Sequence, residues 1–279
     1  MSLGTRGSAP GRQRRLLRAF VQRDFRIEKS YRFAFVAQFG GALTTLLSAG
    51  FLSRLVPGGQ ASLVRYGGDY FTFVLIGSAT LGYFTVALGG FSDSLAQEQQ
   101  YGTLEALLAS PNDPRVLLLY GAAWPLVFST VQLALYLVAG GLLFHAKISS
   151  THLLLAGAMV LLTVIAFSAV GLAAAALLIL TKRTGPLVGL IGSAFALLGG
   201  VLYPISVLPR PLQLLAEALP MSHGLDGVRR ALVAHPDLGA IRLDAAILVA
   251  FSVVLVPVAL QTFSWAVDRA RRQGSLSHY

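Results

Sequence analysis

The sequence contains no cysteine and little charge. Of its 279 residues, 12% are Asp, Glu, Lys or Arg, whereas soluble domains usually carry about 25%. The absence of cysteine excludes disulfides, thiol catalysis and metal sites with cysteine ligands. The shortage of charge leaves too little polar surface to cover a globule in water, and 55% of the residues are hydrophobic. The composition therefore indicates an integral membrane protein.

Patterns of common catalytic and nucleotide-binding sites are missing too. The chain has no GxxxxGK[ST] phosphate-binding loop, so we expect no ATP site of that kind in it. Its five histidines lack the spacing of zinc ligands, and we expect neither a metal nor a cofactor. Ser222, His223 and Asp226 lie within one short turn of sequence, a geometry that a catalytic triad rarely tolerates. We therefore expect no catalytic residues.

Long apolar segments account for most of the chain. About 20 apolar residues suffice to cross a bilayer as a helix. The interiors of six such segments contain no Asp, Glu, Lys or Arg, which disfavours ion-coupled transport because that chemistry almost always needs an ionisable group inside the membrane. The segments are residues 33–53, 70–92, 116–144, 152–180, 186–206 and 244–267. We predict an all-α protein with one membrane domain of six transmembrane helices, residues 33–267.

The N-terminal segment, residues 1–32, is basic rather than continuously apolar. Apolar residues recur at helical spacing between its arginines: Leu16, Leu17, Phe20, Val21 and Phe25. This pattern predicts an amphipathic helix on the cytoplasmic membrane surface, with a disordered basic tail as the alternative. The segment has no apolar core of the kind found in a cleavable signal peptide.

Basic residues are distributed unevenly between the two sides of the predicted bundle. With six spans both termini share a side, and a cytoplasmic placement puts fifteen Lys and Arg residues inside and seven outside. This bias follows the positive-inside rule, and lipid contact accounts for the net charge of +10 without nucleic acid as a partner. We expect a multi-pass protein of the cell (inner) membrane with a cytoplasmic tail at 268–279.

A proline-rich segment, residues 203–243, separates the last two predicted spans. Its leucines recur at helical spacing between prolines. Because backbone inside a bilayer must satisfy its own hydrogen bonds, we predict two short helices that re-enter the outer leaflet as an external hairpin. Asp226, Arg229 and Arg230 are expected to mark its boundary with external water.

Two segments resemble the type-2 ABC exporter permeases. LAQEQQYGTLEALLASP (Leu95–Pro111) is similar to the family's region between the second and third spans, and Tyr203–Leu232 to its hairpin between the fifth and sixth. Span count, N-terminal helix and length agree as well, so the resemblance covers nearly the whole chain. The matching residues are Glu98, Gly102, Thr103, Leu104, Glu105, Ser110, Pro111, Pro204, Leu208, Pro209, Pro220, His223 and Arg229.

The resemblance implies a permease that pairs with a second permease, identical or related. Each copy would bind a cytoplasmic ATPase subunit, which holds the ATP and Mg. Dimerisation of the ATPases would move the loop at 93–115 and open a path outward. The chain departs from the polysaccharide-exporting branch near its first span, where it reads YRFAFVAQFGG, and this favours an amphipathic or lipid-linked substrate.

Residues 93–113 form the predicted coupling element within that loop. We expect a short helix along the cytoplasmic surface, with Glu98 and Glu105 hydrogen-bonded either to the ATPase or to arginines of the N-terminal helix. Periodicity alone also fits an ordinary solvated helix. The predicted coupling residues are Glu98, Gln99, Gly102, Thr103, Leu104 and Glu105. The alternatives are a secondary transporter or channel without an ATPase, a polysaccharide-exporting permease, and a membrane enzyme.

Overall fold

The computed structural model describes residues 9–30, 32–55, 63–66, 68–100, 116, 120–146, 148–149, 151–181, 185–233 and 236–272. Within these ranges every regular element is a helix and no strand occurs, which confirms the predicted all-α class for them. The elements are α1 (Ala9–Ser30), α2 (Arg32–Leu55), η1 (Val64–Tyr66), α3 (Tyr70–Gln100), α6 (Ala123–Phe144), α7 (Leu153–Thr181), α8 (Gly185–Leu198), η2 (Ile205–Val207), α9 (Arg210–Glu217), α10 (Pro220–Ala231) and α11 (Leu238–Arg272).

Four of these helices have the length and composition of membrane spans. The spanning segments are Tyr70–Glu98 in α3, Ala123–Phe144 in α6, Leu153–Ile179 in α7 and Leu238–Arg269 in α11. They correspond to the second, third, fourth and sixth predicted spans. The first predicted span coincides with α2, which is not among the four.

The fifth predicted span, residues 186–206, is wrong in its second half. Helix α8 ends at Leu198 after 14 residues. That length is about 21 Å, short of the ~30 Å hydrocarbon core. Gly200 then turns the chain with a φ of 74°, a left-handed conformation that glycine adopts without a steric penalty. The chain therefore leaves the helix early and continues into η2.

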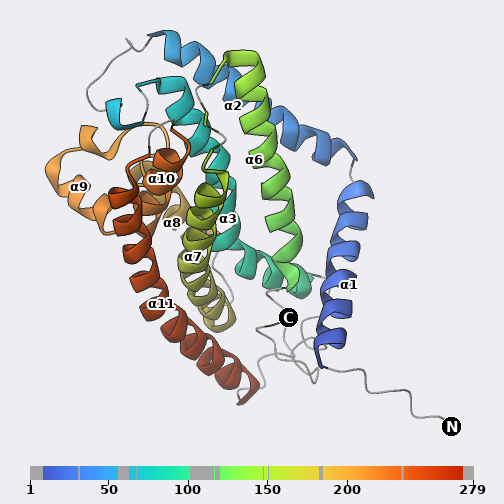
Figure 1. Cartoon of the computed structure of the whole chain (residues 1–279). Coiled ribbons are helices and arrows are strands. Elements are labelled where there is room, and N and C mark those ends of the chain that lie inside the picture. Colours follow the sequence, from blue (N-terminus) through green and yellow to red (C-terminus); the bar gives the residue numbers. More distant parts are fainter. Residues whose placement is uncertain are drawn as a thin grey trace.

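Helix α7 occupies the centre of the bundle, where α3, α10 and α11 pack against it (Figure 1). Ala166, Ala175 and Ala176 on α7 have no exposed surface, and such small side chains let helix backbones approach closely. The approach is tightest at Gly171, where a Cβ would lie 2.3 Å from the carbonyl oxygen of Ala87 on α3. Contact between α3 and α7 is thus nearly backbone to backbone.

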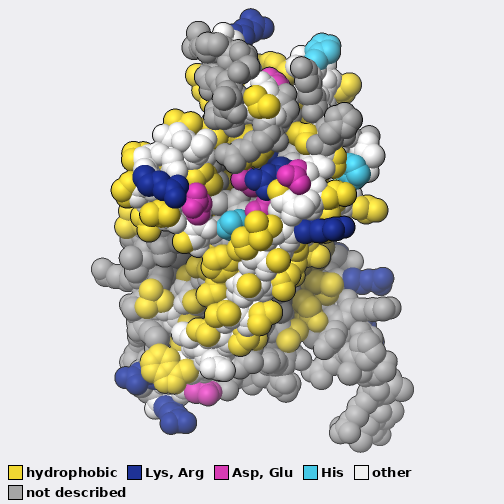
Figure 2. Space-filling model, turned by 60° about the vertical axis from the view of Figure 1, so that its left-hand side comes forward, with side chains coloured by type: hydrophobic (Ala, Val, Ile, Leu, Met, Phe, Trp, Pro, Cys, Tyr) yellow, Lys and Arg dark blue, Asp and Glu magenta, His cyan; other side chains and the backbone are white. Residues whose placement is uncertain are grey.

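Apolar side chains also cover much of the outer surface. Val253, Val254 and Val258 on α11 are 67%, 63% and 56% exposed. Figure 2 shows an apolar band on this face with charged side chains above and below it. Two acidic residues of α11, Asp244 and Asp268, mark the two ends of this band. They are separated by about 36 Å of helix rise, which exceeds the ~30 Å thickness of a hydrocarbon core. The band therefore has the height of a lipid-facing surface.

Helix α1 confirms that the N-terminal segment is helical. It runs alongside the lower part of α6 in Figure 1, where the rings of Phe25 and Trp124 pack edge to face with centroids 5.3 Å apart. Its placement on the membrane surface stays a prediction. Helix α3 continues through Gln100, so the first part of the predicted coupling loop consists of its last turns. Residues 101–115 lie outside the described ranges.

The segment between α8 and α11 contains two short helices, as predicted. Prolines define their starts: Pro209 caps α9, and Pro220 takes the first position of α10, where the missing N–H costs no helical hydrogen bond. Pro204 precedes η2 in extended conformation. Helix α9 lies at the edge of the bundle and α10 packs among α3, α7 and α11 (Figure 1). Re-entry into the outer leaflet stays a prediction.

Replacing Gly171 with Ala should destabilise the protein. The added methyl would meet the carbonyl oxygens of Ala87 and Leu88, which belong to helix backbone and cannot rotate away. We expect a loss of about 1–3 kcal/mol, measured as a lower Tm in detergent. Gly141→Ala on α6 is the matched control, because a Cβ there has no neighbour within 4 Å. Equal Tm changes in the two variants would contradict the described α3–α7 contact.

Candidate functional site

Buried charged side chains lie at the two opposite ends of α3. Near its start, the Phe73 carbonyl oxygen accepts a hydrogen bond from Arg229. Near its end, Glu98 accepts one from Arg23. The rise between Phe73 and Glu98 is about 37 Å, enough to cross a ~30 Å hydrocarbon core. The two ends of α3 therefore suit opposite faces of a membrane.

The Glu98 end of α3 is tied to α1 by an ion pair. Arg23 donates from Nη1 to Glu98 Oε1 at 2.9 Å and from Nε to Asp24 Oδ1 at 2.8 Å. Glu98 is only 4% exposed. Burial lowers the pKa of Arg23, the carboxylates of Asp24 and Glu98 raise it, and the net direction is upward. Glu98 thus makes the contact to an N-terminal arginine that was one of its two expected arrangements.

The other predicted coupling residues carry no structural test. Gln99 lies in the last turn of α3, and its side chain is not described. Gly102, Thr103, Leu104 and Glu105 fall outside the described residues. Their coupling role stays a prediction.

A cavity of about 340 Å³ separates α3 from α8, with α7 and α10 completing its wall. Phe84, Phe167 and Phe195 line it, and among the described residues of its wall only Asp93 is charged. Asp93 was expected in a loop, whereas α3 continues past it as part of the spanning segment. The predicted span 70–92 contains no acidic residue, but α3 continues past its end and carries Asp93 and Glu98 there.

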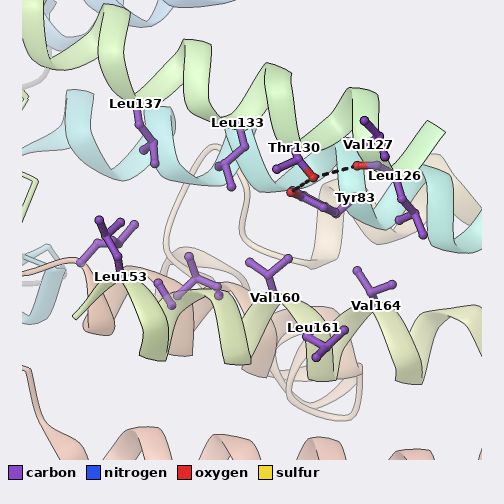
Figure 3. A pocket seen from close by; sticks show the side chains of 14 residues that line it. Tyr83, Leu126, Val127, Thr130, Leu133, Leu137, Leu153, Val160, Leu161 and Val164 are labelled. Carbon is purple, nitrogen blue, oxygen red and sulfur yellow. Dashed lines mark hydrogen bonds between the residues drawn. The ribbon is translucent and has the colours of Figure 1, made fainter. Parts of the chain in front are cut away.

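A second cavity, of about 410 Å³, lies between α6 and α7 (Figure 3). Its wall is aliphatic apart from Tyr83 and Thr130. The Tyr83 hydroxyl donates to Thr130 Oγ1 at 2.8 Å, and the Thr130 hydroxyl donates to the Leu126 carbonyl oxygen at 2.9 Å. Both hydroxyl protons are therefore engaged within the protein, and the cavity offers an almost wholly apolar surface.

At the other end of α3, Arg229 is 1% exposed, and each of its three guanidinium nitrogens donates a hydrogen bond. It donates to the carbonyl oxygens of Phe73 at 3.2 Å, Gly200 at 2.8 Å and Val201 at 2.8 Å. It also lies 3.5 Å from the centroid of the Phe73 ring. Burial lowers the pKa of Arg229 to about 10, so the group stays charged at neutral pH. Arg229 therefore joins α10 to α3 and to the end of α8.

The expectation that Arg229 faces external water is thus wrong. The early end of α8 leaves backbone carbonyl groups without helical partners, and Arg229 supplies the donors. Gly77 makes room for it, because a Cβ there would lie 2.4 Å from Arg229 Nη2. No sequence pattern predicts the burial of Arg229, because it depends on the residue at which α8 ends.

Charged side chains next to Arg229 link α10 to α11. Arg230 donates to Asp244 Oδ2 at 2.7 Å and lies 3.6 Å from Asp226. His223 contacts Asp244 Oδ1 through Nδ1 at 3.0 Å and the Glu217 carbonyl oxygen through Nε2 at 2.9 Å. The hydrogen bond to Asp244 raises the pKa of His223 against the opposing effect of burial. His223 and Arg230 therefore hold α10 against α11. In the described ranges, no group of three or more His, Cys, Asp or Glu residues is placed to hold a metal ion.

Comparison with protein families decides the class of the chain. The family model described as ABC-2 type transporter matches residues 15–233. The chain belongs to the ABC-2 type transporter family. The match runs from α1 to the end of α10 and so includes both ends of α3. The comparison with curated proteins gave no match.

The family assigns the chain to the permeases of ABC transporters, and its apolar helices are transmembrane helices. An ABC-2 membrane domain is a permease component and not an ATPase. The resemblance on which this class was predicted is thereby confirmed. Pro204, Pro209 and Pro220 of the predicted hairpin shape its turns, whereas His223 and Arg229 fasten it to the rest of the permease.

Arg229→Ala should lower the stability of the permease, because three backbone carbonyl groups lose their charged donor. We expect a loss of about 2 kcal/mol or more, measured as a lower Tm in detergent. Arg242→Ala on α11 is the control, since Arg242 is exposed and surface changes usually stay within about 0.5 kcal/mol. A Tm for Arg229→Ala as high as that of the control would contradict the described role.

Proposed function

We propose that this permease is the membrane half of an ATP-driven exporter. Two permease copies, identical or related, form the translocation path, and each binds one cytoplasmic ATPase subunit that holds ATP and Mg. The observation that carries the proposal is the arrangement of α3. Its Glu98 end is joined to α1 and continues toward the predicted coupling residues, and its opposite end is joined to the hairpin by Arg229.

Six spans with both termini in the cytoplasm complete this proposal. Helix α2 supplies the first span. Helix α8 with the turn at Gly200 supplies the fifth, a short span that relies on Arg229 where its helix ends. The bias of fifteen basic residues against seven supports the orientation. Burial of Arg229, one of the seven, removes a basic residue from the external surface. The membrane is the cell (inner) membrane.

In this arrangement α9 and α10 form the external hairpin. The exposed leucines of α9, Leu214 at 54% and Leu215 at 56%, suit the outer leaflet. The helical form of both segments satisfies backbone hydrogen bonds at that depth. The substrate class is amphipathic or lipid-linked, because the cavities along the spans have mainly apolar walls.

The ion pair between Arg23 and Glu98 should transmit motion from the coupling region to the spans. We expect Glu98→Ala to keep ATP hydrolysis by the purified permease–ATPase complex while lowering ATP-driven transport into inverted vesicles. Arg23→Ala should behave alike, and the double variant should be no worse than either, with a coupling energy of about 0.5–3 kcal/mol for residues in contact.

Asp268→Ala is the control for this experiment, because it removes an exposed acid from the same end of the bundle. Wild-type transport in both Glu98→Ala and Arg23→Ala would contradict the coupling role of the ion pair and leave Glu98 with a structural role alone. A permease that transports without any ATPase subunit would contradict the proposed function as a whole.

A further inference from the structure

Asp93 is an exposed carboxylate on a cavity wall whose other described residues are uncharged. It has no hydrogen bond or ion pair among the described residues. Glu98, the other acid in this span, is neutralised by Arg23 at 2.9 Å. The two acids therefore differ in their partners. Glu98 forms an ion pair with α1, whereas the carboxylate of Asp93 can pair with the charge of a bound ligand.

Aromatic rings form the wall that rises from Asp93 toward the middle of the bundle. The centroids of Phe84 and Phe167 are 5.5 Å apart, and those of Phe167 and Phe195 are 5.2 Å apart. Leu88 and Met221 add aliphatic surface to the same wall. The cavity thus combines one negative charge with a long apolar surface.

The order of charged and apolar groups along the cavity matches their order across one lipid leaflet. Along α3 the cavity extends from Leu81 to Asp93, a rise of about 18 Å, slightly more than half of a ~30 Å hydrocarbon core. Asp93 lies nearest the Glu98 end, only about 8 Å of rise from it. An amphiphile in that leaflet has its polar head at the interface and its apolar body toward the membrane centre. The cavity presents the carboxylate and the rings in the same order.

We propose that the cavity between α3 and α8 binds a cationic amphiphile. Its ammonium group lies beside Asp93 and its apolar body lies along the partly exposed side chains of Leu81, Phe195 and Ala196. The inference rests on the proposed function and narrows its substrate class from amphipathic molecules to those with a positive head group. Charge complementarity carries it, since an anionic head group would bring a second negative charge next to the carboxylate of Asp93.

The cavity between α6 and α7 supplies the internal contrast. None of the described residues that line it is charged, and the hydroxyl protons of Tyr83 and Thr130 are engaged within the protein. It therefore offers no negatively charged described residue to a cationic head group. Any ligand that enters by apolar contact alone should bind the two cavities without regard to Asp93.

The test measures binding of three probes that share one alkyl chain and differ in charge: dodecyltrimethylammonium, dodecylsulfonate and dodecanol. The full-length permease is held in nanodiscs, and uptake by empty nanodiscs is subtracted. We expect the wild type to bind the cation more tightly than the other two. Asp93→Asn should weaken binding of the cation at least about tenfold, because one charge pair is lost, and should leave dodecanol binding unchanged. Asp93→Glu should restore most of the affinity.

Two further variants separate a binding role from a structural one. Asp268→Asn removes one exposed negative charge at the same end of the bundle and should keep wild-type affinity. Phe195→Leu keeps the cavity apolar but removes a ring that contacts the shared alkyl chain, and should weaken binding of the cation and of dodecanol alike. Equal affinity for the three probes in the wild type, or an unchanged cation affinity in Asp93→Asn, would overturn the inference.

These outcomes are independent of export itself. The binding measurement needs no ATPase, so cation binding that depends on Asp93 would stand even if ATP-driven transport were never observed. Conversely, ATP-driven transport that Asp93→Asn leaves unchanged for a cationic substrate would overturn the inference and leave the proposed exporter intact.

Discussion

The fold depends on the burial of the Arg229 guanidinium among three backbone carbonyl groups. Helix α8 stops after 14 residues, too short to cross a bilayer as a helix, and the carbonyl groups of Gly200 and Val201 then need donors away from water. Arg229 supplies them at 2.8 Å each and reaches Phe73 as well. A buried charge is costly unless every contact is made. The end of α8, the start of α3 and α10 are therefore held together as one unit.

The permease consequently has two ends of different character. At the Arg229 end, α10 is fixed by buried charge and by the ion pairs of Arg230 and Asp244. At the other end, α1 is joined to α3 through Arg23, which is more exposed than its partner Glu98. The cavity next to Asp93 lies between these ends, beside α8. A force applied near Glu98 would thus act on α3, which forms one wall of that cavity and is anchored at its far end.

Hydropathy was sufficient to predict four spans and the helical class, because continuous apolar segments are local in sequence. Prolines likewise predicted the two hairpin helices, since a proline fixes where a helix starts. The end of α8 was missed because residues 199–206 carry no charge, and the turn at Gly200 is stabilised by a side chain 29 residues away. The position of Asp93 inside α3 was missed because the predicted span was ended at the first acidic residue after the apolar segment. Both errors concern charged residues, Arg229 and Asp93. Which groups surround each of them is decided by the folded chain and not by the neighbouring sequence.

The central claim is that the Glu98 end of α3 and the hairpin face opposite sides of the membrane, with Glu98 toward the cytoplasm. The chain has no cysteine, so single-cysteine variants report one position each. An impermeant maleimide added to intact cells should label Pro236→Cys, and should label Gln100→Cys and Arg272→Cys only after the membrane is opened. Labelling of Gln100→Cys from outside, with Pro236→Cys protected, would contradict the account.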